Sequence, residues 1–279
     1  MTVINTNTGS LYAQQAMTSN ARGLSSVMQQ LSTGKRINNS VDDVAGMAIS
    51  TRLTSQIRGL NQAVRNSNDG ISLIQTAEGA TEQVTNMLQR MRELAVQASN
   101  DTNNTSDRSF LDLEFQALNS QINQIASYTQ WNAANVLDGA GGSGSGVFSF
   151  QVGANASQTI SVTLPNMQTT SGGVLTNIAS SVITSTSTAN SALGAISTAL
   201  DSVNLERAKM GAVISRLQFT SDNLSNVAAK AQESRSRIED TDYSQSTTDL
   251  ARRNIIQQAA QAMLAQANQA PQAVLQLLR

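Results

Sequence analysis

The sequence predicts a mainly α-helical fold: a long antiparallel coiled-coil rod with paired terminal helices and a small central β-hairpin region. Apolar residues recur at spacings of three and four along most of the chain, which is the pattern of a helix with one buried seam. Aromatic residues are only 3% of the 279, so the core must consist of thin aliphatic seams rather than large rings. Strict alternation of apolar and polar residues occurs only near the middle.

The first helix is expected within residues 1–44 and the last within 241–279. In the first, the apolar positions Met17, Ala21, Leu24, Met28 and Leu31 step alternately by four and three. In the last, the same spacing begins at Ile256, and Pro271 predicts a kink. The predicted polymerisation seam consists of Leu24, Met28, Leu31, Ile256, Met263, Val274, Leu275, Leu277 and Leu278.

Residues 45–240 are expected to form the rod. One seam begins at Leu53 and continues, after a shift of frame at Val84, as far as Ala98. The polar stretch Asn100–Arg108 predicts a turn, and a shorter helix with Phe115 in its seam follows. A second long helix is expected over 193–231, and the polar stretch Glu239–Ser246 should end it.

The middle of the chain is short and differs in composition. Gly139–Gly146 is too rich in glycine to hold a helix and predicts a turn. Val147–Val152 and Thr159–Leu164 alternate with period two, which predicts a β-hairpin at about 147–164. So short a middle predicts that no large outer domain is present.

Composition excludes several classes of function. The chain has no His and no Cys, so it lacks histidine acid–base chemistry, thiol catalysis and the commonest metal ligands. The net charge is −1 without any cluster of basic residues, and no stretch approaches the roughly 18 apolar residues of a membrane span. We therefore expect no cofactor, no nucleic acid, no membrane insertion and no enzyme activity.

The two ends match in length and pattern, so they can pair with one another. A single helix pair with many Ala and Gln residues is marginally stable, and the Leu-rich C-terminus would remain exposed in a monomer. A self-assembling structural protein is the hypothesis this favours. Two alternatives stay open: a hydrolase using Asp42, Asp43 and Glu78, and a coiled-coil signalling rod. The exposed tail could also be a frayed end without function.

Several motifs at both ends resemble those of the bacterial flagellin family. In the N-terminal half they are Ile4–Gln15, Leu31–Ile49, Arg65–Ala80, Leu88–Ala98 and Thr129–Gly139. In the C-terminal half they are Ala228–Tyr243 and Gln257–Arg279. Trp131 and Ala133 depart from the residues common in the family, Phe and Gly, and the second departure could alter a local turn. Hook–filament junction proteins share part of the pattern and are the alternative within this resemblance.

The resemblance implies a secreted subunit that polymerises with copies of itself into the extracellular flagellar filament. It also implies export through a type III apparatus, an export chaperone, and contacts with filament cap and hook–filament junction proteins. Cytosolic innate sensors and the host Toll-like receptor for flagellin are further implied partners. O-glycans on the 140–190 region remain open.

Two groups of residues are singled out as sites. The resemblance places receptor recognition and subunit packing on the helix around Arg90, with Arg90, Leu94 and Glu114 as the receptor contacts; a solvated face is the alternative. Asp42 and Asp43 follow a turn where the terminal helix should meet the rod, so they are expected to form the joint or to cap the next helix. The recognition group comprises Gln89, Arg90, Arg92, Glu93, Leu94, Gln97 and Glu114.

Overall fold

The computed structural model describes residues 6–170 and 172–277. The chain forms two compact units, Met1–Ser55 with Lys230–Arg279 and Gln56–Ala229. Within the described residues the fold is mainly α-helical, with a small β region in the middle, as the sequence predicts. The breaks between the terminal and the long helices lie near residues 44 and 241, and the functional division at those residues stays a prediction.

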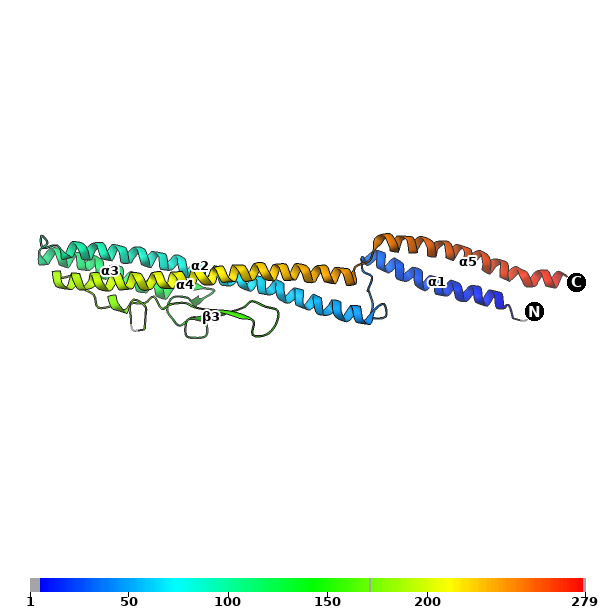
Figure 1. Ribbon diagram of the computed structural model, residues 1–279, viewed down its shortest axis with the longest axis horizontal. Coiled ribbons are helices and arrows are strands. Elements are labelled where there is room, and N and C mark those ends of the chain that lie inside the picture. Colours follow the sequence, from blue (N-terminus) through cyan, green and yellow to red (C-terminus); the bar gives the residue numbers. More distant parts are fainter. Residues whose placement is uncertain (1–5, 171, 278–279) are drawn as a thin grey trace. The chain divides into compact units, whose positions relative to one another are not determined.

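The first unit contains the terminal helices α1 (Thr8–Thr33) and α5 (Tyr243–Leu277), which lie side by side and antiparallel (Figure 1). Asn7 caps α1 by accepting a hydrogen bond from the Ser10 N–H. Gly34 ends α1 at φ 71°, a left-handed conformation that glycine adopts without strain. The helix α5 continues through position 271 to Leu277, and the side chains from 270 onward lie outside the described residues.

The seam between α1 and α5 uses a different set of positions from the predicted one. Met28 is 55% exposed and Met263 is 61% exposed, so within a single chain these two residues lie outside the contact between α1 and α5, and their role in a polymerisation seam stays a prediction. Leu24 and Leu31 are partly buried as expected. The other positions on the facing side of α1 include Asn20, before Leu24, and Val27, between Leu24 and Leu31, and both are buried. The spacing of apolar residues did not reveal this set of seam positions, because one of them, Asn20, is polar.

The apolar positions predicted to form the seam between the long helices are buried, as expected. On α2 (Val44–Ser99) the positions from Val84 to Ala98 that were assigned to the seam are fully buried. On α4 (Thr186–Glu239) Ile196, Val203 and Leu217 are also fully buried. Thin rows of aliphatic side chains therefore form most of the core.

The third helix of the larger unit, α3 (Thr105–Tyr128), begins inside the stretch that was expected to be a turn. Asn104 and Asp107 form a reciprocal capping box, in which each side chain accepts a hydrogen bond from the other residue's backbone N–H. The turn therefore ends at Asn104. Phe115, in the α3 seam, is fully buried.

The β region contains the predicted hairpin and a second, smaller one. Strands β3 (Val147–Gln151) and β4 (Thr159–Thr163) pair antiparallel, within one residue of the predicted limits. Strands β1 (Gln130–Trp131) and β2 (Ala134–Asn135) form a minimal hairpin that alternation could not reveal, because each strand has two residues. A short 3-10 helix, η1 (Thr176–Ile178), precedes α4.

The larger hairpin packs on α2 through positions that lack bulky side chains. A Cβ built on Gly70 would lie 3.1 Å from the ring of Phe150, and one built on Gly59 would lie 3.0 Å from the Ala154 Cβ. Between them the Asn66 amide donates a hydrogen bond to the Gln151 carbonyl at 3.0 Å. Glycines on α2 therefore allow the hairpin to approach the helix closely.

The tight turn between β1 and β2 holds Ala133 at φ 63°, where a Cβ is strained. We expect Ala133→Gly to raise the free energy of unfolding by about 1 kcal/mol, because glycine adopts this conformation without the penalty. Thermal or denaturant unfolding measures the change. The matched control is Ala134→Gly in β2. This substitution should lower stability, because glycine at an ordinary strand position raises the conformational entropy of the unfolded chain and relieves no strain. An equal loss at both positions would contradict the strain.

Candidate functional site

The terminal helix pair is held by hydrogen bonds from asparagine side chains to the opposite backbone. The Asn7 amide donates to the Ala267 carbonyl at 2.7 Å, and the Asn20 amide donates to the Arg253 carbonyl at 2.8 Å. The Tyr243 hydroxyl donates to the Leu31 carbonyl at 2.8 Å. These bonds bring the two helices together without a wide apolar contact.

Because the seam is narrow, large apolar side chains remain on the outside of the pair. Met263 and Tyr12 are among the most exposed, at 61% and 74%. The predicted seam residues Val274, Leu275, Leu277 and Leu278 have side chains outside the described residues. Among the described side chains of α1 and α5, the exposed large apolar ones are Leu11, Tyr12, Met28, Tyr243, Ile255, Ile256 and Met263.

In the joint that follows α1, both predicted carboxylates accept hydrogen bonds from backbone N–H groups. Asp43 accepts a hydrogen bond from the Gly46 N–H at 2.8 Å and so caps α2. Asp42 accepts from the backbone N–H groups of Asn38 and Asn39 at 3.0 and 2.9 Å, which fixes the preceding turn. Capping accounts for these two residues, and a role in conformational change at the joint stays a prediction.

A second part of the joint was not predicted: a short backbone pairing between the end of α1 and the break before α5. The Arg36 N–H donates to the Glu239 carbonyl at 2.7 Å, and the Thr241 N–H donates to the Gly34 carbonyl at 3.0 Å. Lys35 and Asp240 form the bridge between these bonds. The two ends of the chain are thereby tied together where the helices break.

Glu239 is the charged centre of this joint, with only 14% of its side chain exposed. Its carboxylate pairs with Lys35 and accepts a hydrogen bond from the Ser50 hydroxyl, while Arg235 lies at 4.0 Å. The hydrogen bond from Lys35, followed by that from Ser50, holds the pKa of Glu239 below its ordinary value, against the opposing effect of burial. The carboxylate is therefore charged in the folded joint at neutral pH.

On the larger unit, the predicted recognition residues Arg90 and Glu114 are paired with each other. The Arg90 guanidinium donates to Glu114 on α3 at 2.9 Å and to Glu93 on α2 at 2.9 Å. These bonds, that to Glu114 most strongly, raise the pKa of Arg90 above its ordinary value. The ion pair fixes the guanidinium on an exposed surface that includes both α2 and α3.

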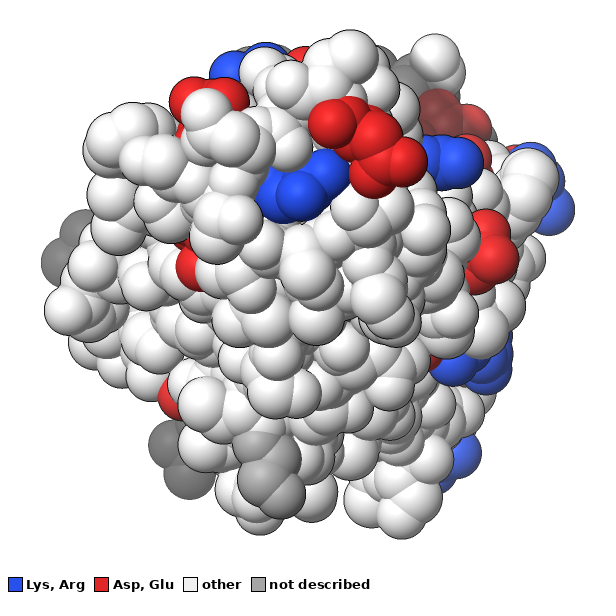
Figure 2. Space-filling view, turned by 90° about the vertical axis from the view of Figure 1, so that its left-hand side faces the viewer, with Lys and Arg blue, Asp and Glu red and all other residues white. Residues whose placement is uncertain are grey.

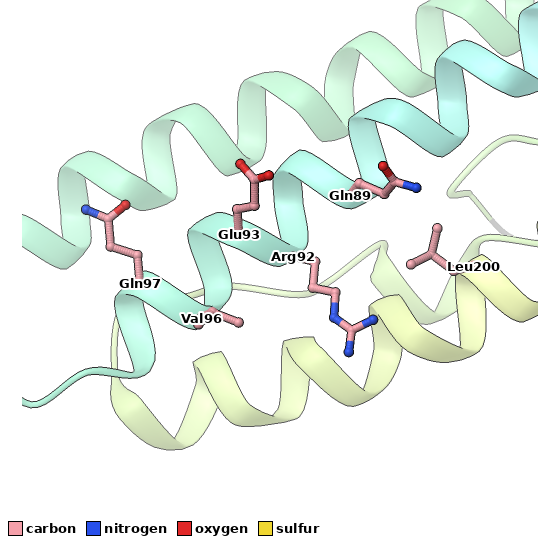
Figure 3. Close-up of a pocket in the computed structure, with 6 residues that line it drawn as sticks. All are labelled: Gln89, Arg92, Glu93, Val96, Gln97 and Leu200. Atoms are coloured by element: carbon pink, nitrogen blue, oxygen red, sulfur yellow. The ribbon is translucent and has the colours of Figure 1, made fainter.

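An open groove of about 640 Å³ lies beside this ion pair, between α2 and α4 (Figure 3). Val96 is 53% exposed and lines the groove. Leu94, predicted to contact a receptor, is 1% exposed and lies in the core, so it supports the surface from beneath. Helix α2 supplies all the lining residues except Leu200 of α4: Gln89, Arg92, Glu93, Val96, Gln97 and Leu200.

Charge is sparse on the molecular surface. Figure 2 shows one face on which basic and acidic groups of both signs are scattered among uncharged atoms. Within residues 6–170 and 172–277, no cluster of three potential ligands could hold a metal ion. No helix in that same part of the chain is both long and apolar enough to cross a membrane.

The alternative enzyme hypothesis relied on Asp42, Asp43 and Glu78. Asp43 caps α2, Asp42 fixes the turn before it, and Glu78 lies 4.0 Å from Arg207 on α4. Each carboxylate therefore has a structural partner.

The residues that sequence reasoning missed are polar. The terminal pair is held by Asn20 and Arg253, and the joint is held by Glu239. A search for regularly spaced apolar residues does not detect any of these three. A signal for Asn20 was present, because it falls four residues before Leu24 and seven before Val27, at seam spacing. Nothing comparable marks Glu239, whose partners are distant in sequence.

Long helices with thin seams, paired ends and apolar residues left outside define a class of protein: a helical structural subunit whose exposed side chains suit packing against other subunits. Comparison with known proteins agrees with this class. Residues 4–141 match the bacterial flagellin N-terminal helical region, and residues 193–278 match the bacterial flagellin C-terminal helical region. The β region lies largely between the two matches.

Individual relatives match over the whole chain. A flagellin of Halalkalibacterium halodurans is 46% identical over 99% of this chain and 100% of its own length. A flagellin of Bacillus subtilis is 39% identical, with 99% of each chain covered. The chain belongs to the bacterial flagellin family. It is a structural protein, a subunit of the flagellar filament.

Solved structures agree on the fold. A crystal structure of Bacillus cereus flagellin has a TM-score of 0.50 at 28% identity and covers 60% of this chain and 94% of its own. A flagellar hook-associated protein of Vibrio parahaemolyticus has a TM-score of 0.62 at 14% identity, covering 71% of this chain and 100% of its own. At that identity the likeness shows the fold alone. The full-length matches therefore favour a filament flagellin over the junction-protein alternative.

The joint predicts a pH-dependent contribution to stability. Since the folded-state pKa of Glu239 lies below its ordinary value of 4.5, the contribution is present above about pH 4.5 and is lost as the pH falls through the lowered pKa. At pH 7 we expect Glu239→Gln to lower the free energy of unfolding by about 1.5 kcal/mol, since it loses hydrogen bonds to a charged group. Denaturant titrations at a series of pH values measure the difference.

The matched control is Glu233→Gln, at an exposed carboxylate whose pKa is lowered by its neighbours Lys230 and Arg237 on the same helix. That substitution should change unfolding little, because solvent screens exposed pairs. A Glu239→Gln deficit that does not shrink as the pH falls below 4.5 would contradict the assignment.

Proposed function

We propose that the exposed apolar side chains of α1 and α5 form the surface through which this flagellin packs against neighbouring copies in the filament. The observation that carries the proposal is that seven large apolar side chains in the described part of α1 and α5 are at least 45% exposed. Water contact with so many apolar groups is unfavourable, and a second copy can remove it. The narrow seam within one chain leaves these groups for that purpose.

The antiparallel register places two of these side chains at the same level along the pair. Starting from the contact between Asn7 and Ala267, Tyr12 lies five residues onward on α1 and Met263 lies four residues back on α5, so the two are at the same level. Ile256 lies seven residues before Met263, on the same side of α5. The outer apolar face is defined here as Tyr12, Ile256 and Met263.

We expect Ile256→Ser combined with Met263→Ser to raise the critical concentration for polymerisation at least tenfold. Each large apolar side chain buried at an interface is worth about 1.5–3 kcal/mol, and 1.4 kcal/mol corresponds to a tenfold change. Sedimentation of filaments grown from short seeds measures the critical concentration. The control is Gln261→Ser, an exposed polar position of the same helix. Unchanged assembly of the double variant would refute this surface.

The finer partners follow from the same exposed groups. A chain with such a surface needs protection before it is incorporated, so we propose that an export chaperone covers the α5 end of the monomer. Secretion through a type III apparatus, and contacts with filament cap and hook–filament junction proteins, are proposed on the family likeness. The division into residues 1–44 and 241–279 as polymerisation module and 45–240 as rod is proposed on the positions of the helix breaks.

We also propose that the surface around Arg90 binds the host Toll-like receptor for flagellin. The support is an exposed guanidinium held in one orientation by Glu114 and Glu93, beside an open groove. A fixed arginine next to apolar side chains is a common centre of binding energy. Since Leu94 is buried, it would act by supporting α2 rather than by touching the receptor.

Arg90→Ala combined with Glu114→Ala should reduce receptor signalling by the monomer about tenfold or more, the effect of losing an interface hot spot. A reporter cell assay measures signalling, and circular dichroism should show unchanged helix content. Glu82→Ala, an exposed carboxylate elsewhere on α2, is the control and should leave signalling unchanged. Full signalling by the double variant would exclude this site.

A further inference from the structure

The terminal pair leaves large apolar side chains exposed beside its seam. If α1 and α5 were each turned about their axes by roughly one residue position, about 100°, Met28, Ile256 and Met263 would enter the seam, while Leu24, Val27 and Leu31 would leave it. In the observed rotation the seam contains the polar Asn20 with Arg253 beside it. Because each rotation buries some apolar groups and exposes others, a specific contact can select between the two.

That contact lies where Arg253 crosses Gly23. The Arg253 guanidinium occupies the space that a Cβ on residue 23 would fill, so glycine forms a notch in α1 and the guanidinium sits in it. At the same level, Asn20 is 8% exposed and donates its amide hydrogen to the Arg253 carbonyl at 2.8 Å. The side chain and the backbone of one α5 residue therefore both engage the same turn of α1.

Arg253 has no competing role in the described part of the chain. The neighbouring Arg252 pairs with Asp249 at 3.5 Å, whereas no ion pair to Arg253 forms among residues 6–170 and 172–277. Its long stem can lie along the seam while the charged head emerges over the glycine. The contact is therefore one of shape complementarity: the large Arg253 side chain on α5 fills the space left by the missing side chain of Gly23 on α1.

We propose that Arg253, seated in the notch at Gly23, sets the rotation of α1 against α5 and thereby holds Met28, Ile256 and Met263 outward for neighbouring subunits. Arg253 is a positioning residue in this role, since it acts through the apolar side chains that it keeps exposed. The inference rests on the proposed function, in which those side chains form the contact between copies.

The sign of a glycine substitution distinguishes this notch from an ordinary helical glycine. Replacing a helix-interior glycine with alanine normally stabilises the helix. Here Gly23→Ala should displace the guanidinium and impair the pair, but only while Arg253 is present. Gly9→Ala is the matched control on the same helix, because its Cβ would lie 3.8 Å from the Ala267 Cβ, an ordinary contact, and should do no harm.

A disulfide can report the rotation directly, because the natural chain has no cysteine. With 3.8 Å between a Cβ at position 9 and the Ala267 Cβ, the pair Gly9→Cys and Ala267→Cys meets disulfide geometry in the observed rotation. A turn of either helix separates the two sulfurs. The experiment compares the rate of disulfide formation in the full-length monomer at fixed oxidant, and the rate of seeded elongation for the same substitutions without the cysteines.

We expect Gly23→Ala and Arg253→Ala each to slow disulfide formation and elongation at least fivefold. Combining them should restore both rates to within twofold of the parent, because the alanine methyl group fills the space that the guanidinium has left. If the two substitutions merely destabilised the helix pair, the combined variant would instead show slower disulfide formation and slower elongation than either single variant.

Two results would overturn the proposal: unchanged disulfide rates in both single variants, or a Gly23→Ala effect of the same sign with and without Arg253. A different result bears on the proposed function. If the single variants slow the disulfide but leave elongation unchanged, then Arg253 sets the rotation as proposed, and Met28, Ile256 and Met263 do not form the assembly surface.

Discussion

Almost every feature of this flagellin depends on the narrowness of a two-helix seam. Two antiparallel helices bury only the stripe that each turns toward the other, and apolar side chains flanking that stripe stay in water. Along α2 and α4, further elements cover part of the flanks: α3 supplies Phe115 and the hairpin supplies Phe150. The terminal pair has no such cover among the described residues, so its flanking groups stay exposed in the single chain.

Polar contacts decide how the terminal helices meet. Hydrogen bonds from Asn7 and Asn20 to opposite carbonyls satisfy amides that would otherwise be costly in a seam. The backbone pairing at Lys35 and the nearly buried charge of Glu239 fix the place where the chain ends converge. Such contacts fix how the two helices are placed but add little to the free energy of folding. Helices that are held in this way can pack against neighbouring subunits during assembly.

The surface around Arg90 shows how burial redistributes roles along one helix. Met91, Leu94 and Ala95 lie in the core, while Arg90, Glu93 and Val96 lie outside. Because the helix repeats every 3.6 residues, buried and exposed residues alternate along it. A substitution of a buried residue changes stability, whereas a substitution of an exposed residue changes the surface. Changes at Leu94 should be interpreted as changes in stability first and in recognition second.

The sequence by itself determined the helical class, the long seams from Val84 to Ala98 and along α4, and the hairpin at 147–164, because each depends on local periodicity. Family membership was visible in its motifs. Only the tertiary structure decided the rotation of the terminal pair, where Asn20 replaces an apolar residue, and the partners of Glu239. Those depend on contacts between residues more than 180 positions apart, whose energies no local pattern encodes.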